Sequence, residues 1–404
     1  MNERQTGPIR LDLSIALLAT AIASLGPLTM TMYLPAMPAL TADLGAPEAL
    51  AKLTLTVYLL SFAFGQLVYG PVSDRLGRRP ALAMGLVIYC LASALAAVAP
   101  SIEWLLAARL IQGFGACAGP TIARAMIRDL YSGTAAARAM SVIGMTIAVA
   151  PAAGQVFGGL MTEVGSWRWI FVILGIFGIA IFVLSSRRLR ETNVRPDPTA
   201  TRLGTMVTNY ALLLSSRRYL AYVLAVSCCV GGLFAYAASA PFVLISIVGI
   251  SAVDYGFLGL FPVAGTFLGT LTINRFAHRV PLIRLVWLGL ASSATAGIGQ
   301  FVLLTLGDVN VPIVIGSMTL WMFGFGLLMP GAMAGALGPF PRIAGSASAL
   351  MGFCQMGIGA LGTLLSAALN DGYVVSLALA PAIMGVIGIV AFALLHRKEA
   401  VSGA

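Results

Sequence analysis

Twelve apolar runs constrain what this chain can fold into. Each approaches the roughly 20 residues that a helix needs to cross the hydrocarbon core of a bilayer. Inside lipid, only helices and closed barrels satisfy every backbone N–H and C=O, and runs of this length are typical of helices. The runs begin near residues 12, 49, 80, 103, 138, 168, 219, 253, 282, 309, 345 and 373.

The composition supports this interpretation. Of the 404 residues, 59% are hydrophobic and 9% are charged, and the mean hydropathy is +0.96. A chain this apolar would precipitate in water, so lipid must be its solvent. We therefore predict an all-α polytopic membrane protein with twelve transmembrane helices in two six-helix bundles.

The net charge of +10 reflects topology rather than nucleic-acid binding, because the arginines are spread over many short loops. Twelve spans place both termini on one side, and only Lys52 and Arg168 fall on the other. By the positive-inside rule, we expect cytoplasmic termini in a bacterial-type inner membrane. The cations on the cytoplasmic side, outside the central linker, are Arg4, Arg10, Arg75, Arg78, Arg79, Arg124, Arg128, Arg138, Arg275, Arg279, Arg284, Arg342, Arg397 and Lys398.

The cysteines suggest neither a metal site nor a disulfide framework. All five lie inside predicted spans at unrelated spacings. We expect no metal and no cofactor. The first apolar run continues to about residue 39, which is too long for the apolar region of a signal peptide, so we interpret it as the first span.

A polar, arginine-rich stretch with two prolines at 185–218 divides six spans from six. It predicts an N-terminal bundle at 1–190, a cytoplasmic linker at 191–216 and a C-terminal bundle at 217–404. The segment NRFAHR at 274–279 follows span 8 much as DRLGRR at 74–79 follows span 2. Equivalent loops indicate a parallel duplication, an architecture in which substrate binds near the midplane between the halves.

Several motifs resemble those of a known family. The segment GPVSDRLGRRP at 70–80 resembles the signature after the second span of the major facilitator superfamily, and RLIQG at 109–113 resembles its fourth-span signature. MYLPAMP at 32–38, ARAMIRDLY at 123–131, APAAG at 150–154, GG at 158–159 and GSWRWIF at 165–171 resemble the Bcr/CflA branch. That branch contains bicyclomycin- and chloramphenicol-type multidrug exporters.

The resemblance implies a gating clasp after span 2. In the family, Gly70 lets spans 2 and 11 approach closely, Asp74 faces the N-terminal end of span 11 near Ser346, and Arg78 pairs with Asp129. A carboxylate near a helix N-terminus gains about 0.3 to 2 kcal/mol, enough to favour an outward-open state. The alternative is a surface loop that only obeys the positive-inside rule. The implied gating residues are Gly70, Asp74, Arg75, Gly77, Arg78 and Asp129.

Arg109 is the first candidate for substrate binding or coupling. It lies about 9 Å of helix rise beyond Glu103, and a cation in lipid costs at least about 2.5 kcal/mol unless it faces a cavity or a partner. The alternative is an arginine that snorkels outward toward Glu103. The resemblance implies a role in proton coupling or substrate binding. The candidates for substrate binding or coupling are Arg109, Gln112, Tyr33, Thr31, Tyr58, Tyr236 and Gln355.

Span 5 carries a proline and glycines, Pro151, Gly154 and Gly158, which the family treats as a mark of antiporters. Ala150 stands where the family has a glycine. Small residues at this spacing also let helices pack closely, so general helix packing is the alternative.

The positions of the acidic residues predict the charge of the substrate. None of the 14 falls firmly near mid-membrane, and Thr31 stands where related exporters carry an acid. Without such a carboxylate a cationic drug lacks a counter-ion, whereas Arg109 suits a carboxylate, a phosphonate or a polar neutral molecule. We therefore expect neutral or anionic substrates.

The chain has no Ser/His/Asp set at a credible spacing and no phosphate-binding loop, so we predict neither an enzyme nor an ATP-driven pump. The prediction is a monomeric, alternating-access exporter of small drugs or drug-like metabolites in exchange for protons. Two alternatives stay open, a carrier for an amino acid, nucleoside or organic acid, and a non-transporting membrane scaffold or sensor.

Overall fold

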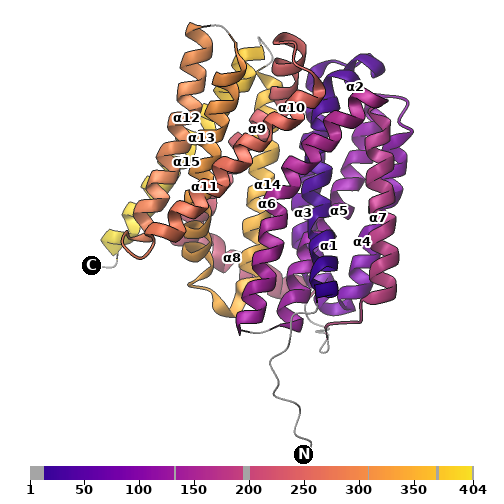
Figure 1. Ribbon diagram of the computed structural model, residues 1–404. Coiled ribbons are helices and arrows are strands. Elements are labelled where there is room, and N and C mark those ends of the chain that lie inside the picture. Colours follow the sequence, from indigo (N-terminus) through magenta and orange to yellow (C-terminus); the bar gives the residue numbers. More distant parts are fainter. Residues whose placement is uncertain (1–12, 132, 194–200, 308, 370–372, 403–404) are drawn as a thin grey trace, which may run out of the picture.

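The computed structural model describes residues 13–131, 133–193, 201–307, 309–369 and 373–402. This part of the chain is helical and contains no strand. The predicted fold class is therefore confirmed. Figure 1 shows the helices standing side by side, with the start of α1 at the lower end of the molecule. We call the end that holds the α3–α4 turn the lower end and the other the upper end.

The helices before residue 190 form one group, in which α5 packs against α1, α3 and α4, and α6 packs against α1. A 3-10 turn, η1, interrupts the first span at Leu34–Ala36, where Pro35 cannot donate a backbone hydrogen bond. The helices are α1 (Leu13–Thr31), α2 (Met37–Leu44), α3 (Glu48–Leu76), α4 (Arg78–Ala97), α5 (Ile102–Leu130), α6 (Gly133–Val164) and α7 (Arg168–Arg188).

The helices after residue 216 form a second group, in which α9 packs against α13, α14 and α15. The predicted linker is not wholly extended, because it contains the helix α8 (Leu203–Ser215). The other elements are α9 (Arg217–Pro241), η2 (Phe242–Ile247), α10 (Ala252–Leu258), α11 (Leu260–Phe276), α12 (Leu282–Leu306), α13 (Val311–Leu337), η3 (Pro341–Ile343), α14 (Ala344–Ala368) and α15 (Tyr373–Ser402).

The described helices agree with the predicted number of spans. Eleven helical segments are long and apolar enough to cross a membrane. The twelfth predicted span is α5, whose 29 residues include Arg109, Gln112 and several glycines that lower its hydropathy. It is long enough to span, at about 1.5 Å of rise per residue. Arg109 and Gln112 are tolerated within it because both are buried among other helices rather than exposed to lipid.

The two groups of helices meet mainly through α3 with α14 and α6 with α10. At the upper end, the backbone at Gly159 of α6 lies directly against the carbonyl of Ala252 of α10, and Thr56 of α3 bonds to Thr363 of α14 at 2.7 Å. Toward the lower end, α11 and α12 lean away from the first group (Figure 1). The groups are therefore closely packed at the upper end and diverge below.

Candidate functional site

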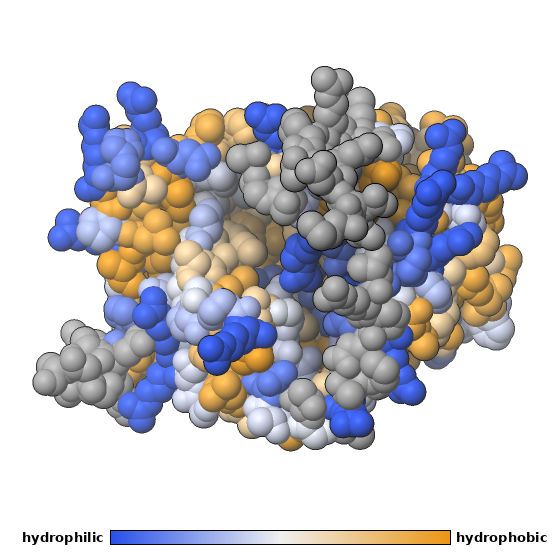
Figure 2. Space-filling view, turned by 90° about the horizontal axis from the view of Figure 1, so that it is seen from below, coloured by the Kyte–Doolittle hydropathy of each residue, from blue (hydrophilic) through white to orange (hydrophobic). Residues whose placement is uncertain are grey.

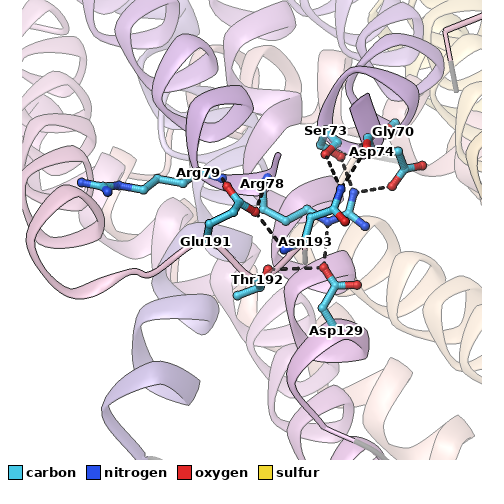
Figure 3. A network of polar contacts seen from close by, with 9 residues as sticks. All are labelled: Gly70, Ser73, Asp74, Arg78, Arg79, Asp129, Glu191, Thr192 and Asn193. Atoms are coloured by element: carbon cyan, nitrogen blue, oxygen red, sulfur yellow. Dashed lines mark hydrogen bonds and ion pairs between the residues drawn. The ribbon is translucent and has the colours of Figure 1, made fainter. Parts of the chain in front are cut away.

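The turn between α3 and α4 holds a polar cluster at the lower end (Figure 3). Gly77 makes the turn with φ +100, a conformation that glycine adopts without strain. The buried guanidinium of Arg78 donates from Nε to Asp129 at 2.8 Å and from Nη1 to Ser73 at 2.8 Å and to Asp74. The predicted pair of Arg78 with Asp129 is therefore present, and a second carboxylate joins it.

Glu191, which follows α7, caps the start of α4. Its carboxylate accepts hydrogen bonds from the backbone N–H of Arg78 at 2.8 Å and of Arg79 at 3.0 Å. Burial raises the pKa of the Glu191 carboxyl, but four backbone N–H groups, those of Arg78, Arg79 and the two residues that follow Glu191, outweigh it. The pKa is therefore below its ordinary value, and the carboxylate stays charged at the positive end of the helix dipole.

Two further linker residues complete the cluster. The Asn193 amide donates to the carbonyl of Asp74 at 2.8 Å, which satisfies an acceptor at the end of α3, and the Thr192 hydroxyl donates to Asp129 at 3.3 Å. We use "the clasp" for Ser73, Asp74, Arg78, Asp129, Glu191, Thr192 and Asn193. Four of these, Ser73, Glu191, Thr192 and Asn193, were not among the predicted gating residues, although an acid and an amide directly after a run of arginines were an available signal for the linker residues.

The expected contact of Asp74 with α14 is absent from the part of the chain described. The Asp74 side chain is half exposed and bonds to Arg78, and the Ser346 hydroxyl instead accepts from Asn209 of α8 at 3.4 Å. Arg75 is exposed and donates to Thr201 of the linker at 2.8 Å. In this state Asp74 is held by Arg78, because the two groups of helices diverge at this end, and its contact with the start of α14 stays a prediction for the state in which this end is closed.

The role expected for Gly70 is also not seen. An added Cβ at Gly70 would meet nothing within 4 Å, so this glycine does not mark a close approach. The helices α3 and α14 do approach closely further up, where the Gln66 side chain leaves no room for a Cβ at Gly352. No close approach is seen at Gly70 because the two groups of helices, and with them α3 and α14, diverge toward the lower end.

Arg109 lies in an aromatic cage inside the first group of helices. Its side chain is fully buried, and its Cζ lies 4.2 Å from the ring centroids of both Tyr33 and Tyr58 and 5.8 Å from that of Phe171. This arrangement excludes the alternative in which Arg109 snorkels outward to Glu103. Rings on both sides stabilise a desolvated guanidinium by about 2 kcal/mol or more each.

A hydrogen-bond chain extends the cage. Arg109 Nη1 donates to the Gln112 side-chain oxygen at 2.7 Å, and Gln112 Nε2 donates to the hydroxyl of Ser93 at 2.8 Å. Arg109 Nη1 also donates to the Thr29 carbonyl at 3.5 Å, whereas its Nε and Nη2 have no partner. The structure thus brings together four predicted residues, Arg109, Gln112, Tyr33 and Tyr58. Ser93 and Phe171 were not singled out, because a serine and an aromatic residue inside an apolar run look like ordinary packing residues.

The other substrate candidates lie apart from Arg109. Thr31 is 9% exposed and donates to the Pro27 carbonyl at 3.0 Å in its own helix. Tyr236 of α9 is buried and Gln355 of α14 is half-buried, and both belong to the second group of helices. None of the three contacts Arg109 in the described structure. If they bind substrate, they would contact a part of it that does not face Arg109.

The glycines of α6 are packing positions. An added Cβ at Gly154 would meet the hydroxyl of Thr31, and one at Gly158 would overlap the carbonyl of Met32. Pro151 lies inside the same helix. The alternative reading of this motif, close helix packing, therefore describes what these residues do here, and their link to antiport stays a prediction.

Comparison with known proteins identifies the family. The family model described as Major Facilitator Superfamily matches residues 19–363. The Uncharacterized MFS-type transporter YdgK of Bacillus subtilis (strain 168) is 34% identical over 97% of each chain. Multidrug resistance protein D of Escherichia coli (strain K12) is 31% identical over 87% of this chain and 88% of its own.

The fold is shared with a solved structure, a bacterial homologue of the human lysosomal transporter Spinster in an inward-facing and unoccupied conformation. Its TM-score is 0.76 at 18% identity, with 96% of this chain and 97% of that chain covered. The helices, the polar turn after the second span and these matches agree over nearly the whole sequence. The chain belongs to the Major Facilitator Superfamily.

Proposed function

We propose that the chain exports small drugs or drug-like metabolites across the inner membrane by alternating access, in exchange for protons. The relative named Multidrug resistance protein D supports the substrate class. The observation that carries the mechanism is the unequal packing of the two groups of helices, which is close at the upper end and loose at the lower end. A carrier that opens on one side at a time has this asymmetry.

The lower end is cytoplasmic in this proposal. Figure 2 shows that face from below, with hydrophilic side chains around a central hollow. At the upper end, Lys52 is buried and Arg168 is paired with Asp43. The unequal distribution of free cations supports cytoplasmic termini by the positive-inside rule. Exposed arginines at the lower ends of helices include Arg75, Arg79, Arg187, Arg188, Arg275 and Arg279.

The positions of the acids support a neutral or anionic substrate. Each described carboxylate lies in a loop or within the first or last turn of its helix, so the middle of the membrane has no described counter-ion for a drug cation. Arg109 is a fully buried cation within the first group of helices, and two of its nitrogens, Nε and Nη2, have no hydrogen-bond partner. We propose that these donors bind an acceptor on the substrate when the aromatic cage rearranges.

The clasp would change partners during the cycle. In the state described here, Asp74 bonds to Arg78, and Asn209 bonds to Ser346. When the lower end closes, the start of α14 comes within reach of Asp74, and its free N–H groups favour a carboxylate. The exchange would stabilise the outward-open state, and the present structure corresponds to the inward-open one.

The test is collapse of a respiration-generated pH gradient in inverted membrane vesicles, on addition of neutral, anionic and cationic compounds. We expect a neutral or anionic compound to collapse the gradient, and Asp74→Asn and Arg109→Ala vesicles to lose the response. Collapse by cations alone would contradict the charge preference. Substrate flux without any collapse would exclude proton antiport while leaving export intact.

A further inference from the structure

Lys52, one turn into α3 at the upper end, has an unusual environment. Its side chain is fully buried, and its Nζ lies 5.9 Å from the ring centroid of Phe242 in η2. Of the three donors of the ammonium group, one reaches a partner, the hydroxyl of Ser376 in α15, at 3.3 Å. Lys52 belongs to the first group of helices and both contacts belong to the second. Its surroundings therefore exist only while the upper end is closed.

The partner hydroxyl belongs to a cluster from three helices of the second group. The Ser376 hydroxyl lies 3.3 Å from that of Ser239 in α9, which lies 2.5 Å from that of Ser366 in α14. The Ser376 hydroxyl is thus linked to the other two, and it alone of the three contacts the ammonium, which it solvates only in part. Replacing a buried charge of this kind by an apolar side chain is often stabilising, whereas removing its hydrogen-bond partner is destabilising.

The acidic residue nearest in sequence attracts Lys52 without forming an ion pair with it. Glu48 lies one turn earlier on α3 and interacts electrostatically with the ammonium, but no ion pair within 4.0 Å joins the two in the described structure. The Glu48 Oε2 atom is itself buried without a partner. The closed upper end thus contains an ammonium and a carboxylate oxygen that water would solvate better.

We propose that Lys52 is a gating residue of the transport cycle, whose incompletely solvated ammonium sets how readily the upper end opens. Opening separates Lys52 from Ser376 and Phe242 and returns the ammonium to water, which recovers its hydration. The inference rests on the proposed alternating access and adds the residue that keeps the closed upper end from becoming too stable. The hydrogen bond to the Ser376 hydroxyl stabilises the closed upper end, but it satisfies only one of the three N–H donors of Lys52 and therefore does not prevent opening.

The test measures exposure of the upper end directly. Ala252 is 8% exposed and packs against Gly159 of α6 in the closed state. In protein whose five cysteines are replaced and which carries Ala252→Cys, a water-soluble maleimide labels this position in lipid nanodiscs only when the upper end opens. We expect Lys52→Met to slow labelling about tenfold and Ser376→Ala to speed it by a similar factor, the change that about 1.4 kcal/mol produces.

Two controls exclude trivial explanations. Pro100→Cys, in an exposed loop, reports reagent access and should label equally in all variants. Arg168→Met removes the other cation of the upper end, whose pairing with Asp43 stays within one group of helices, and should not change labelling of the reporter. Equal shifts in Lys52→Met and Ser376→Ala, or no shift in either, would overturn the proposal.

The measurement is independent of any transported compound. If the vesicles show no export but the two variants shift labelling in opposite directions, the gating role stands and the proposed substrate class fails. If export is seen but labelling does not respond, the gate is set by other residues. The two failures are therefore distinguishable.

Discussion

At the scale of the residue, the cage of Arg109 depends on the shape of the guanidinium as much as on its charge. The planar group lies 4.2 Å from the rings of both Tyr33 and Tyr58, a stacking that a lysine ammonium cannot reproduce. We expect Arg109→Lys to lower the free energy of unfolding by about 1 to 2 kcal/mol and to reduce export at least tenfold. Export by resistant cells and thermal melting of the purified protein measure the two effects.

The matched control is Arg168→Lys, because Arg168 is partly exposed and pairs with Asp43 as a charge. It should keep export and stability close to those of the parent. If Arg109→Lys also transports normally, the positive charge alone is what matters, and the stacking has no functional role.

Glu191 gives the clasp a dependence on pH. Because its pKa is lower in the folded protein than in the unfolded chain, it contributes stability above the ordinary carboxyl pKa of about 4.3, and this contribution is lost as pH falls through the folded value. We expect Glu191→Gln to melt at a lower temperature than the parent at pH 7, with the difference shrinking as pH falls below the ordinary carboxyl pKa and through the lower folded pKa. A difference that stays constant with pH would show that the charge of Glu191 is irrelevant.

At the scale of the element, α6 offers a comparison between two glycines of one helix. Gly158 lies against the carbonyl of Met32, whereas Gly144 has nothing within 4 Å of an added Cβ. We expect Gly158→Ala to force α6 away from the first span and to destabilise the protein by about 1 to 3 kcal/mol. Gly144→Ala should be neutral or stabilise by up to about 1 kcal/mol, because alanine favours a helix. The measurement is the melting temperature of each variant in the same detergent. Equal shifts in melting temperature would contradict close packing at Gly158.

Helices were predictable because apolar run length fixes their number and approximate bounds, and the charged turn after α3 could be located by its arginines. The contents of the clasp were only partly predictable. Arg78 and Asp129 were found through a motif, whereas Glu191 and Asn193 come from a linker more than a hundred residues away, and only folding shows that they reach the turn. The bond of Asp74 to Arg78 was not predicted, because a sequence does not say which end of the helix bundle is closed in a given structure.

At the scale of the whole molecule, the proposed cycle requires the closed upper end to open, and one of the contacts that cross it joins α3 to α14. The hydroxyl of Thr56 in α3 lies 2.7 Å from that of Thr363 in α14. We expect a disulfide between Thr56→Cys and Thr363→Cys, made in cysteine-free protein, to stop export, because it holds the two groups of helices together. Reduction by dithiothreitol should restore export.

A disulfide within one group separates this effect from general damage by oxidation. Cys229 in α9 and Ser293 in α12 lie close, at 3.5 Å between Sγ and Oγ, but both belong to the second group of helices. If the groups move largely as rigid bodies, protein that keeps Cys229 as its one native cysteine and carries Ser293→Cys can be oxidised without loss of export. Loss of export in both pairs would mean that helices rearrange within a group during the cycle, and continued export with the Thr56–Thr363 positions linked would contradict opening of the upper end.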